Sequence, residues 1–359
     1  MQFPEQGKPP VGIIFDSDIG NRIDDTLALA LLYGFDGKRE ARVVSVSVTK
    51  SNLKAAAFCE AVGRFYAGAV SGAFSAVGRT LPVGLATDGK MPEDTPLFTV
   101  PLSKVNAEGV PVYSHGIEKL NDTAEPTPLI RNAFTAQHDQ NCIVVLAGPA
   151  TNLVKVLDLP GVKDVISKKV RFLSLMGGAY PQGGPEFNIK TDIAAARKLF
   201  AEWPTPIVAS GYEVGEALLF PASSIETDFS WSPAHPVVDA YKAYKAMPYD
   251  APTWDMTAVL YAVRPDAGYF KLSEPGMISV LNDGSTKFSA SPGGTHRYLI
   301  LDPSQKENIV KTYTEIVSAK PVPRQPRRRP QQQEQEQKQQ QQQKPAEPPK
   351  PPEVKPPTP

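Results

Sequence analysis

Four aspartates, Asp16, Asp18, Asp24 and Asp25, lie within ten residues of one another near the beginning of the sequence. Carboxylates that converge on one turn repel each other unless a cation neutralises them, and hard divalent ions prefer oxygen ligands of this kind. Alternation along a strand puts Asp16 and Asp18 on one face, while a helix that begins near Asp24 or Asp25 turns its positive end toward the same point. Capping of that helix would account for one aspartate but not for four, and the spacing of an EF-hand loop is absent. We therefore predict a divalent-metal site.

The segments around these aspartates alternate between strand and helix patterns. Residues 11–15 (VGIIF) form a continuous apolar run of strand length, and residues 26–33 (TLALALLY) contain helix formers with an apolar stripe. A strand at 42–49 and a helix at 52–66 follow, strands recur at 142–146, 170–176 and 206–210, and a helix is expected at 151–157. This order predicts an α/β fold with an open, mostly parallel sheet flanked by helices, in which ligands bind beyond the carboxyl ends of the strands. Residues 88–128, rich in Pro, Gly and Asp, are predicted to form a long excursion or lid.

Composition divides the 359 residues into a single domain, residues 1–319, and a Pro/Gln-rich tail, residues 320–359. The tail has too few apolar residues to offset the entropy of ordering, so we predict that it is disordered, and its partner is not evident from the sequence. From residue 320 onward Lys and Arg outnumber Asp and Glu by nine to four, whereas the whole chain is neutral, so the domain is mildly acidic. An acidic domain suits a cation site and argues against binding of nucleic acid.

Two cysteines, Cys59 and Cys142, are too few for a disulfide framework and have no metal-like spacing, so both are predicted to be buried. The sequence contains neither a run of 18 apolar residues nor the apolar segment of a signal peptide. We therefore expect a cytoplasmic protein that does not enter a membrane, although a mature secreted form would look the same. A homo-oligomer, either a dimer or a tetramer, is an open expectation.

The aspartate-rich segment VGIIFDSDIGNRIDDTLALALL resembles the N-terminal signature of the inosine-uridine-preferring nucleoside hydrolase family, which has the form DxDxG…DD. Further matches follow in order along the chain: Asn52, the Ser114-His115-Gly116 segment, LAGPATNL at 146–153, LMGG at 175–178, PEFN at 185–188 and WDMTAVLYAV at 254–263. Together they cover most of residues 11–264. An ordered set of this kind is far more specific than any one piece.

The resemblance implies a nucleoside-hydrolase-like fold, a bound Ca²⁺ that holds the ribose, and water that replaces the base at the anomeric carbon. It assigns the calcium ligands to Asp18, Asp25, Asp255 and the main-chain carbonyl of Ala147. Asp18 would also be the general base for the attacking water. The cleavage passes through an oxocarbenium-like state, so a firmly held ribose and a deprotonated water are what the chemistry requires.

The same resemblance assigns contacts with the sugar hydroxyls to four residues: Asp24, Asn52, Glu186 and Asn188. Asp16 matches a supporting carboxylate that does not touch the ion. The segment Gly183-Gly184-Pro185 is shorter than in the best-known members and lacks an asparagine that contacts the 5′ side of the ribose, which leaves room for a modified 5′ group. Two additional residues also separate Asp18 from Asp24, compared with the DPGxDD form.

The catalytic acid is where the sequence departs most from the family pattern. Trp254 stands immediately before Asp255, where the inosine-uridine-preferring branch has a histidine suited to protonating the leaving base. An indole cannot donate that proton, but its face can stack on a purine, which resembles the purine-preferring branch. His115 is an alternative acid because its matched segment borders the expected site. His138, His235 and His296 have no matched context and receive no role.

These observations predict an enzyme, a calcium-dependent N-glycosidase that hydrolyses ribonucleosides to ribose and free base, with purines favoured. Two alternatives stay open at this point. One is a ribose-binding or scaffold protein that kept the calcium pocket without catalysis. The other is a phosphatase of the haloacid dehalogenase type, which also opens with a strand followed by DxD, although the Gly20-Asn21 turn and the Asp24-Asp25 pair fit that class poorly.

Overall fold

The aspartate-bearing strand lies inside a 10-stranded sheet, which explains its uninterrupted apolar sequence. The computed structural model describes residues 9–67 and 81–321. The strand order is β11-β10-β12-β6-β5-β4-β1-β2-β3, and β9 pairs with β12. Pairing is parallel from β3 through to β12 and antiparallel where β9, β10 and β11 join. The strands are β1 (Val11–Ser17), β2 (Ala41–Lys50), β3 (Val83–Lys90), β4 (Cys142–Ala147), β5 (Val170–Met176), β6 (Ile207–Ser210), β9 (Phe270–Leu272), β10 (Gly276–Val280), β11 (Thr286–Ala290) and β12 (His296–Leu301).

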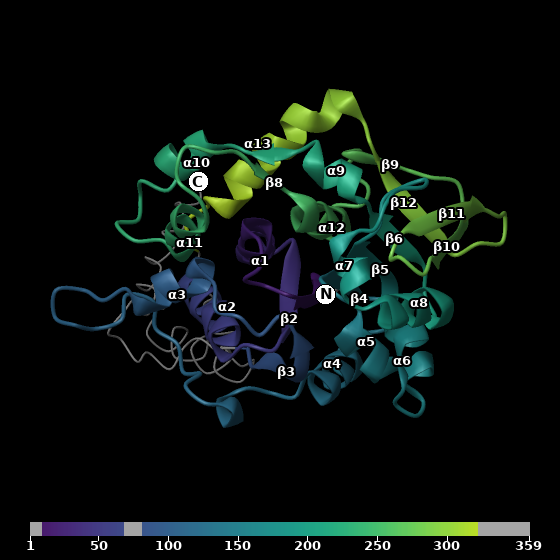
Figure 1. Cartoon of the computed structure of the whole chain (residues 1–359), viewed down its shortest axis with the longest axis horizontal. Coiled ribbons are helices and arrows are strands. Elements are labelled where there is room, and N and C mark those ends of the chain that lie inside the picture. The colour runs from purple at the N-terminus through teal and green to yellow at the C-terminus, as the bar shows by residue number, and fades with distance from the viewer. Residues whose placement is uncertain (1–8, 68–80, 322–359) are drawn as a thin grey trace, which may run out of the picture. The chain divides into compact units, whose positions relative to one another are not determined.

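Helices cover both faces of this sheet (Figure 1). Alternation along β1 sends Ile13 and Phe15 into one hydrophobic core and Ile14 into another. The first core lies against α1 (Ile23–Gly37), α2 (Leu53–Tyr66), α11 (Pro236–Tyr244), α12 (Trp254–Val263) and α13 (Lys306–Val317). The second lies against α4 (Pro126–Thr135), α5 (Thr151–Leu157), α6 (Val162–Lys169) and α8 (Ile193–Glu202). The remaining elements are α3 (Pro96–Ser103), α7 (Phe187–Thr191), α9 (Tyr212–Glu216), α10 (Ala222–Thr227) and the small pair β7 (Leu219–Phe220) and β8 (Ala251–Pro252).

The order β3-β2-β1-β4-β5-β6 reverses its direction of winding between β1 and β4. In open α/β sheets the crevice at such a reversal, beyond the carboxyl ends of the strands, is where ligands bind. Ser17 of β1 lies opposite Ala147 of β4, so the residues that follow both strands meet at this crevice. The fold therefore brings Asp18 to the place that the sheet topology favours for a ligand.

Most of the predicted elements are confirmed, two of them with the expected bounds: β5 at 170–176 and α5 at 151–157. The predicted excursion at 88–128 instead contains α3 and a 3₁₀ helix (Leu120–Asp122) and ends in the first turn of α4. Pro96 begins α3 and Pro126 begins α4. At the first position of a helix the missing N–H of proline costs nothing. Strands β3 and β9 to β12 were not predicted.

All the described residues belong to one compact unit, and both cysteines are free and buried, as predicted. The Pro/Gln-rich tail lies outside the described residues apart from its first two positions, so its disorder stays a prediction. Within the described part of the chain, no helix has both the length and the hydrophobicity needed to cross a bilayer.

Candidate active site

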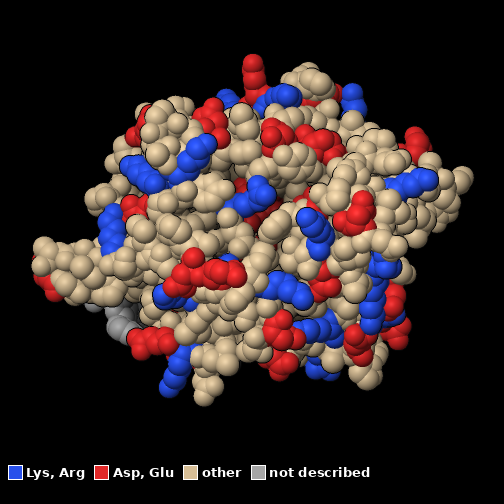
Figure 2. Space-filling view, in the orientation of Figure 1, with Lys and Arg blue, Asp and Glu red and all other residues tan. Residues whose placement is uncertain are grey.

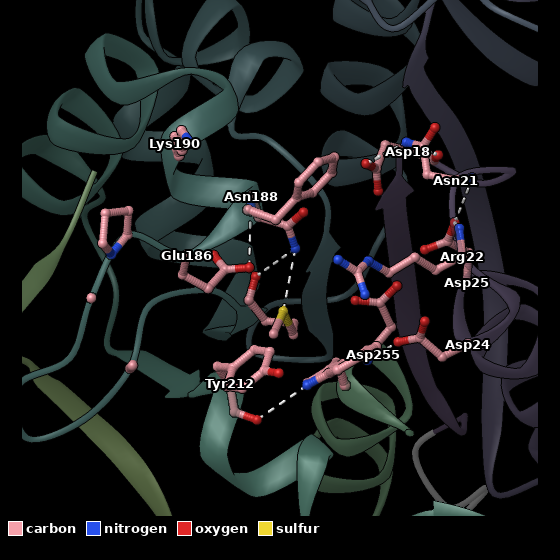
Figure 3. A pocket seen from close by; sticks show the side chains of 16 residues that line it. Asp18, Asn21, Arg22, Asp24, Asp25, Glu186, Asn188, Lys190, Tyr212 and Asp255 are labelled. Atoms are coloured by element: carbon pink, nitrogen blue, oxygen red, sulfur yellow. Dashed lines mark hydrogen bonds between the residues drawn. The ribbon is translucent and has the colours of Figure 1, made fainter. Parts of the chain in front are cut away.

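A cavity of about 410 Å³ opens at the crevice between the two halves of the sheet. Figure 2 shows the molecule hollowed in this region, with acidic atoms recessed beside a basic side chain. Asp18, Asp24, Asp25 and Asp255 lie along one side of the cavity, and Glu186 and Asn188 face them from the other (Figure 3). The predicted aspartates thus converge, although Asp24 and Asp255 are separated by 231 positions in the sequence.

Asp24, Asp25 and Asp255 form the centre of the acidic cluster, with one oxygen of each within 4.8 Å of the others. All three are buried. Asp25 Oδ2 accepts three backbone N–H groups, from Gly20, Asn21 and Arg22, each at 3.1 Å, so the turn wraps around this carboxylate. Asp24 Oδ2 accepts the amide of Asp255 at 3.0 Å, whereas Asp24 Oδ1 has no hydrogen-bond partner among the described residues.

Burial and mutual repulsion make this cluster costly without a cation. Burial, together with the charge of Asp25, raises the pKa of Asp24 to about 7. Burial is also the main cause that raises the pKa of Asp18 and of Asp255 well above its ordinary value, and the neighbouring carboxylates raise both further. A divalent ion would relieve both effects, and the donor set consists of oxygen atoms alone, which suits a hard cation. The unpartnered Asp24 oxygen lies beside the ion position and is left for a bound ligand.

The carbonyl of Ala147 accepts the amide of Asp18 at 3.3 Å, so it lies beside the cluster with a second lone pair free for an ion. A side chain at Gly148 would place its Cβ 2.7 Å from the Asp18 nitrogen, so only glycine permits this close approach of β4 to Asp18. Gly20, at a φ of 108°, makes the turn before α1 and would clash with Phe98 if it had a Cβ.

Asp18 is oriented by a hydrogen-bond chain that the sequence did not reveal. Asn21 Nδ2 donates to Asp18 Oδ2 at 2.7 Å, and Asn21 Oδ1 accepts from Lys50 Nζ at 3.0 Å. Lys50 is buried at the end of β2, where burial lowers its pKa and nearby carboxylates oppose that shift. The asparagine amide therefore fixes which Asp18 oxygen points away from the turn.

Asp16 is buried in β1, two positions before Asp18. Its Oδ1 accepts the hydroxyl of Ser47 at 2.5 Å and the amide of Asn152 at 2.9 Å. Burial raises the pKa of Asp16 to about 7 in spite of these bonds. Asp16 does not line the cavity, which agrees with the supporting position that the sequence suggested.

Glu186 and Asn188 form the wall opposite the aspartates. Glu186 caps α7 and accepts backbone N–H groups from Gly178, Asn188 and Ile189 at 3.0 to 3.2 Å. Asn188 Nδ2 donates to the carbonyl of Met176 at 3.2 Å. These bonds hold both side chains in place at the cavity, where their remaining lone pairs can meet sugar hydroxyls.

Aromatic rings line the mouth of the cavity. Trp254 is partly exposed, stacks on Tyr212 with ring centroids 5.5 Å apart, and donates its Nε1–H to the Tyr212 carbonyl at 3.1 Å. The guanidinium of Arg22 lies 4.7 Å from the centroid of the Trp254 ring and 5.6 Å from that of Phe187. Trp254 is therefore a surface of the cavity rather than a core residue.

Three of the predicted site residues do not line this cavity: Ala147, whose carbonyl borders the cluster, Asn52 and His115. Asn52 caps α2 with its side-chain oxygen and donates its amide to the Pro92 carbonyl and to Asp94. His115 lies next to Gly116, whose amide donates to Glu60 of α2 at 2.7 Å. The assignments of Asn52 to sugar contact and of His115 to proton donation stay predictions that this geometry does not support.

Arg22, Asn21, Lys50 and Tyr212 are the functional candidates that the sequence reasoning missed. The available signal was the pair of additional residues between Asp18 and Asp24, which lengthens the turn that carries Asn21 and Arg22. Lys50 and Tyr212 follow the predicted strands at 42–49 and 206–210, so their position at the carboxyl ends of strands was the signal that could have found them.

The fold and the cavity define an α/β protein with a candidate divalent-metal centre at the reversal of its sheet. The family profile described as inosine-uridine preferring nucleoside hydrolase matches residues 13–320. No curated protein matches the chain significantly.

Several solved structures have the same fold. A plant nucleoside hydrolase is 17% identical, covers 87% of this chain and 100% of its own, and superposes with a TM-score of 0.65. A purine-preferring ribonucleoside hydrolase from Gardnerella vaginalis is 18% identical, with coverages of 86% and 99% and a TM-score of 0.61. An inosine-uridine preferring nucleoside hydrolase from Bacillus anthracis is 17% identical, with coverages of 86% and 99% and a TM-score of 0.61.

The chain belongs to the inosine-uridine preferring nucleoside hydrolase family. It is an enzyme, an N-glycosidase whose substrates are small-molecule ribonucleosides. The predicted family and fold class are confirmed, and this assignment decides against the phosphatase and the non-catalytic binding protein that the sequence left open.

Proposed function

We propose that this nucleoside hydrolase uses a calcium ion bound by Asp18, Asp25, Asp255 and the Ala147 carbonyl, and that it favours purine ribonucleosides. The observation that carries the proposal is the buried acidic cluster, in which Asp24 Oδ1 has no described partner and all donors are oxygen atoms. The aromatic surface of Trp254 and Tyr212 at the same cavity supports the purine preference. The ribonucleoside hydrolase from Gardnerella vaginalis, whose fold this chain shares, is purine-preferring, which agrees with that choice.

When bound, the calcium ion would hold the ribose diol and make a nearby water more acidic. The residues of the chain do the rest. Asp18, oriented by Asn21, accepts the proton of the water that forms a bond to the anomeric carbon. The bond from that carbon to the base nitrogen breaks, and its electron pair leaves with the base. Glu186 and Asn188 are fixed by their backbone contacts and position the sugar. The bound sugar therefore loses little further freedom of motion on reaching the transition state.

A reducing-sugar assay across inosine, guanosine, adenosine, uridine and cytidine tests this proposal. We expect release of ribose that stops on addition of a chelator, returns with calcium, and is fastest for the purines. Asp18→Ala should lower kcat by more than a hundredfold, since it removes the base and one ion ligand together. Asp139→Ala is the matched control, because Asp139 is an exposed acid paired with Lys169 and does not line the cavity. Activity that survives both chelation and Asp18→Ala would overturn the proposal.

The cytoplasmic location and the dimer or tetramer expected from the sequence belong to the same proposal. Cell fractionation and light scattering of the purified full chain measure them directly.

A further inference from the structure

Arg22 is the one described basic side chain that lies against the aromatic surface of the cavity. It is the last residue before α1, and its backbone amide is bonded to Asp25. Figure 3 shows its side chain reaching across the cavity from the aspartates toward the wall of Glu186 and Asn188. Its guanidinium packs on the face of Trp254 and donates no hydrogen bond to a described side chain or backbone group. Five N–H donors are therefore held at the cavity without an acceptor.

Among the described residues that line the cavity, none is an evident proton donor to the departing base. Trp254 cannot protonate it, and its Nε1–H is already donated to the Tyr212 carbonyl. His115 does not line the cavity. Tyr212 is 43% exposed. Burial and the charge of Glu216 raise the pKa of its hydroxyl, which makes it a poor proton donor. Burial raises the pKa of Glu186, although the backbone N–H groups of Gly178, Asn188 and Ile189 oppose that shift; the proposed function assigns this side chain to the sugar hydroxyls rather than to the base.

We propose that Arg22 stabilises the departing base, by donating charge-assisted hydrogen bonds from its guanidinium to ring nitrogen or carbonyl acceptors of that base. The proposal rests on the proposed function and concerns its leaving group. A guanidinium stacked on an indole directs its N–H groups parallel to the ring, so a base beside it meets them edge to edge. Purines offer several acceptors on their edges, whereas a sugar without a base offers none in this position.

The step balances without proton transfer from Arg22. The attacking water bonds to the anomeric carbon and loses its proton to Asp18, while the electron pair of the broken bond passes to the base. The base leaves as an anion paired with the guanidinium and takes its proton from solvent afterwards. Arg22 donates hydrogen bonds to the base and transfers no proton to it.

The test compares two substrates that differ in how much help the leaving group needs. Inosine has a poor leaving group, whereas 4-nitrophenyl β-D-ribofuranoside releases a phenolate that is stable without assistance. We expect Arg22→Ala to lower kcat for inosine about a hundredfold, the typical effect of removing one donor aimed at developing charge, and to change kcat for the nitrophenyl riboside less than threefold. Arg22→Lys, which keeps the charge but loses the planar fork, should fall between the two.

Two measurements separate this role from other effects. The thermal shift produced by calcium should be the same in Arg22→Ala and in the unaltered chain, because the Arg22 amide still bonds to Asp25. Lys190→Ala removes the other cation of the cavity and should leave the ratio of the two kcat values unchanged. If the unaltered chain cleaves neither substrate, the proposed function fails, and this inference fails with it. Equal losses on both substrates, a gain in activity from Arg22→Ala, or the same ratio change from Lys190→Ala would overturn the role of Arg22 alone.

Discussion

Replacing Asp24 by asparagine is expected to stabilise the metal-free protein, and to stabilise it less when calcium is bound. Asp24 Oδ2 accepts the Asp255 amide at 3.0 Å, a bond that an asparagine oxygen can also make. The other oxygen has no described partner, and its charge lies beside Asp25 and Asp255. The substitution therefore removes a buried like charge without removing the one hydrogen bond that the carboxylate makes to the backbone of α12.

The pKa of Asp24 sets the size and the pH window of this effect. Because that pKa is raised from 3.8 to about 7, the folded protein holds the proton more tightly than the unfolded chain does. Stability without metal must then fall as the pH rises from about 4 to about 7, and no penalty exists below about 4. At pH 7.5 the charge of Asp24 lowers the unfolding free energy of the metal-free protein by at most about 4 kcal/mol, and Asp24→Asn removes this loss.

Urea unfolding of both proteins with a chelator, at pH 7.5 and at pH 4.5, measures the effect. Asp24→Asn should raise the unfolding free energy by up to about 4 kcal/mol at pH 7.5 and by only about 1 kcal/mol at pH 4.5. With excess calcium the difference should shrink, because the bound ion offsets the charge of Asp24 in the unaltered chain. Asp139→Asn, at an exposed acid, should stay within about 0.5 kcal/mol under all conditions. A metal-free variant less stable than the unaltered chain at pH 7.5 would contradict the proposed repulsion at Asp24.

Three further predictions concern other parts of the structure. Trp254→Ala should raise the KM for inosine about tenfold, because about 1.4 kcal/mol of stacking is lost. Trp254→Phe should raise the KM less. Steady-state kinetics measure both values, and an unchanged KM would count against a stacking role. Burial lowers the pKa of His235 from 6.5 to about 3, so stability is full above about pH 6.5 and falls by about 2 kcal/mol between pH 7.5 and pH 5. His235→Asn, whose oxygen can accept the Val237 amide as Nδ1 does, should flatten that slope in urea unfolding, and an equally steep slope would contradict the assignment. A Cβ at Gly34 would come within 2.4 Å of the Ile316 carbonyl, so Gly34→Ala should cost about 1–3 kcal/mol by thermal unfolding, and an unchanged Tm would show that α13 can shift freely.

The features that could be predicted are those written in contiguous sequence. The apolar run of β1 and the aspartates that follow it specify a buried strand and an acidic turn within a few residues of each other. Asp255 could be assigned only through the family resemblance, because no local pattern connects it to Asp24. Strand β3 was missed because its second half, ATDGK, lacks the apolar or alternating pattern of a strand. Strands β9 to β12 are short and mostly lie at one end of the sheet, where half-exposed residues weaken the pattern.

Side-chain direction was the part that the sequence could not supply. Arg22 and Asn21 are neighbours in the same turn, yet one points across the cavity and the other bonds to Asp18 and Lys50. Asn52 matched a family position, but in this structure its oxygen is used to cap α2. Such outcomes depend on the exact path of a turn, which two additional residues are enough to alter.

The bond between Asp24 and the amide of Asp255 links the metal centre to the order in which the chain is synthesised. Asp18, Asp24 and Asp25 leave the ribosome early, but Asp255 follows some 230 residues later with α12. Until α12 docks, the early carboxylates have an incomplete set of ligands and hold an ion only weakly. Tight ion capture would then accompany one of the last docking events, so a truncated chain ending before α12 should neither retain the ion nor gain stability from it.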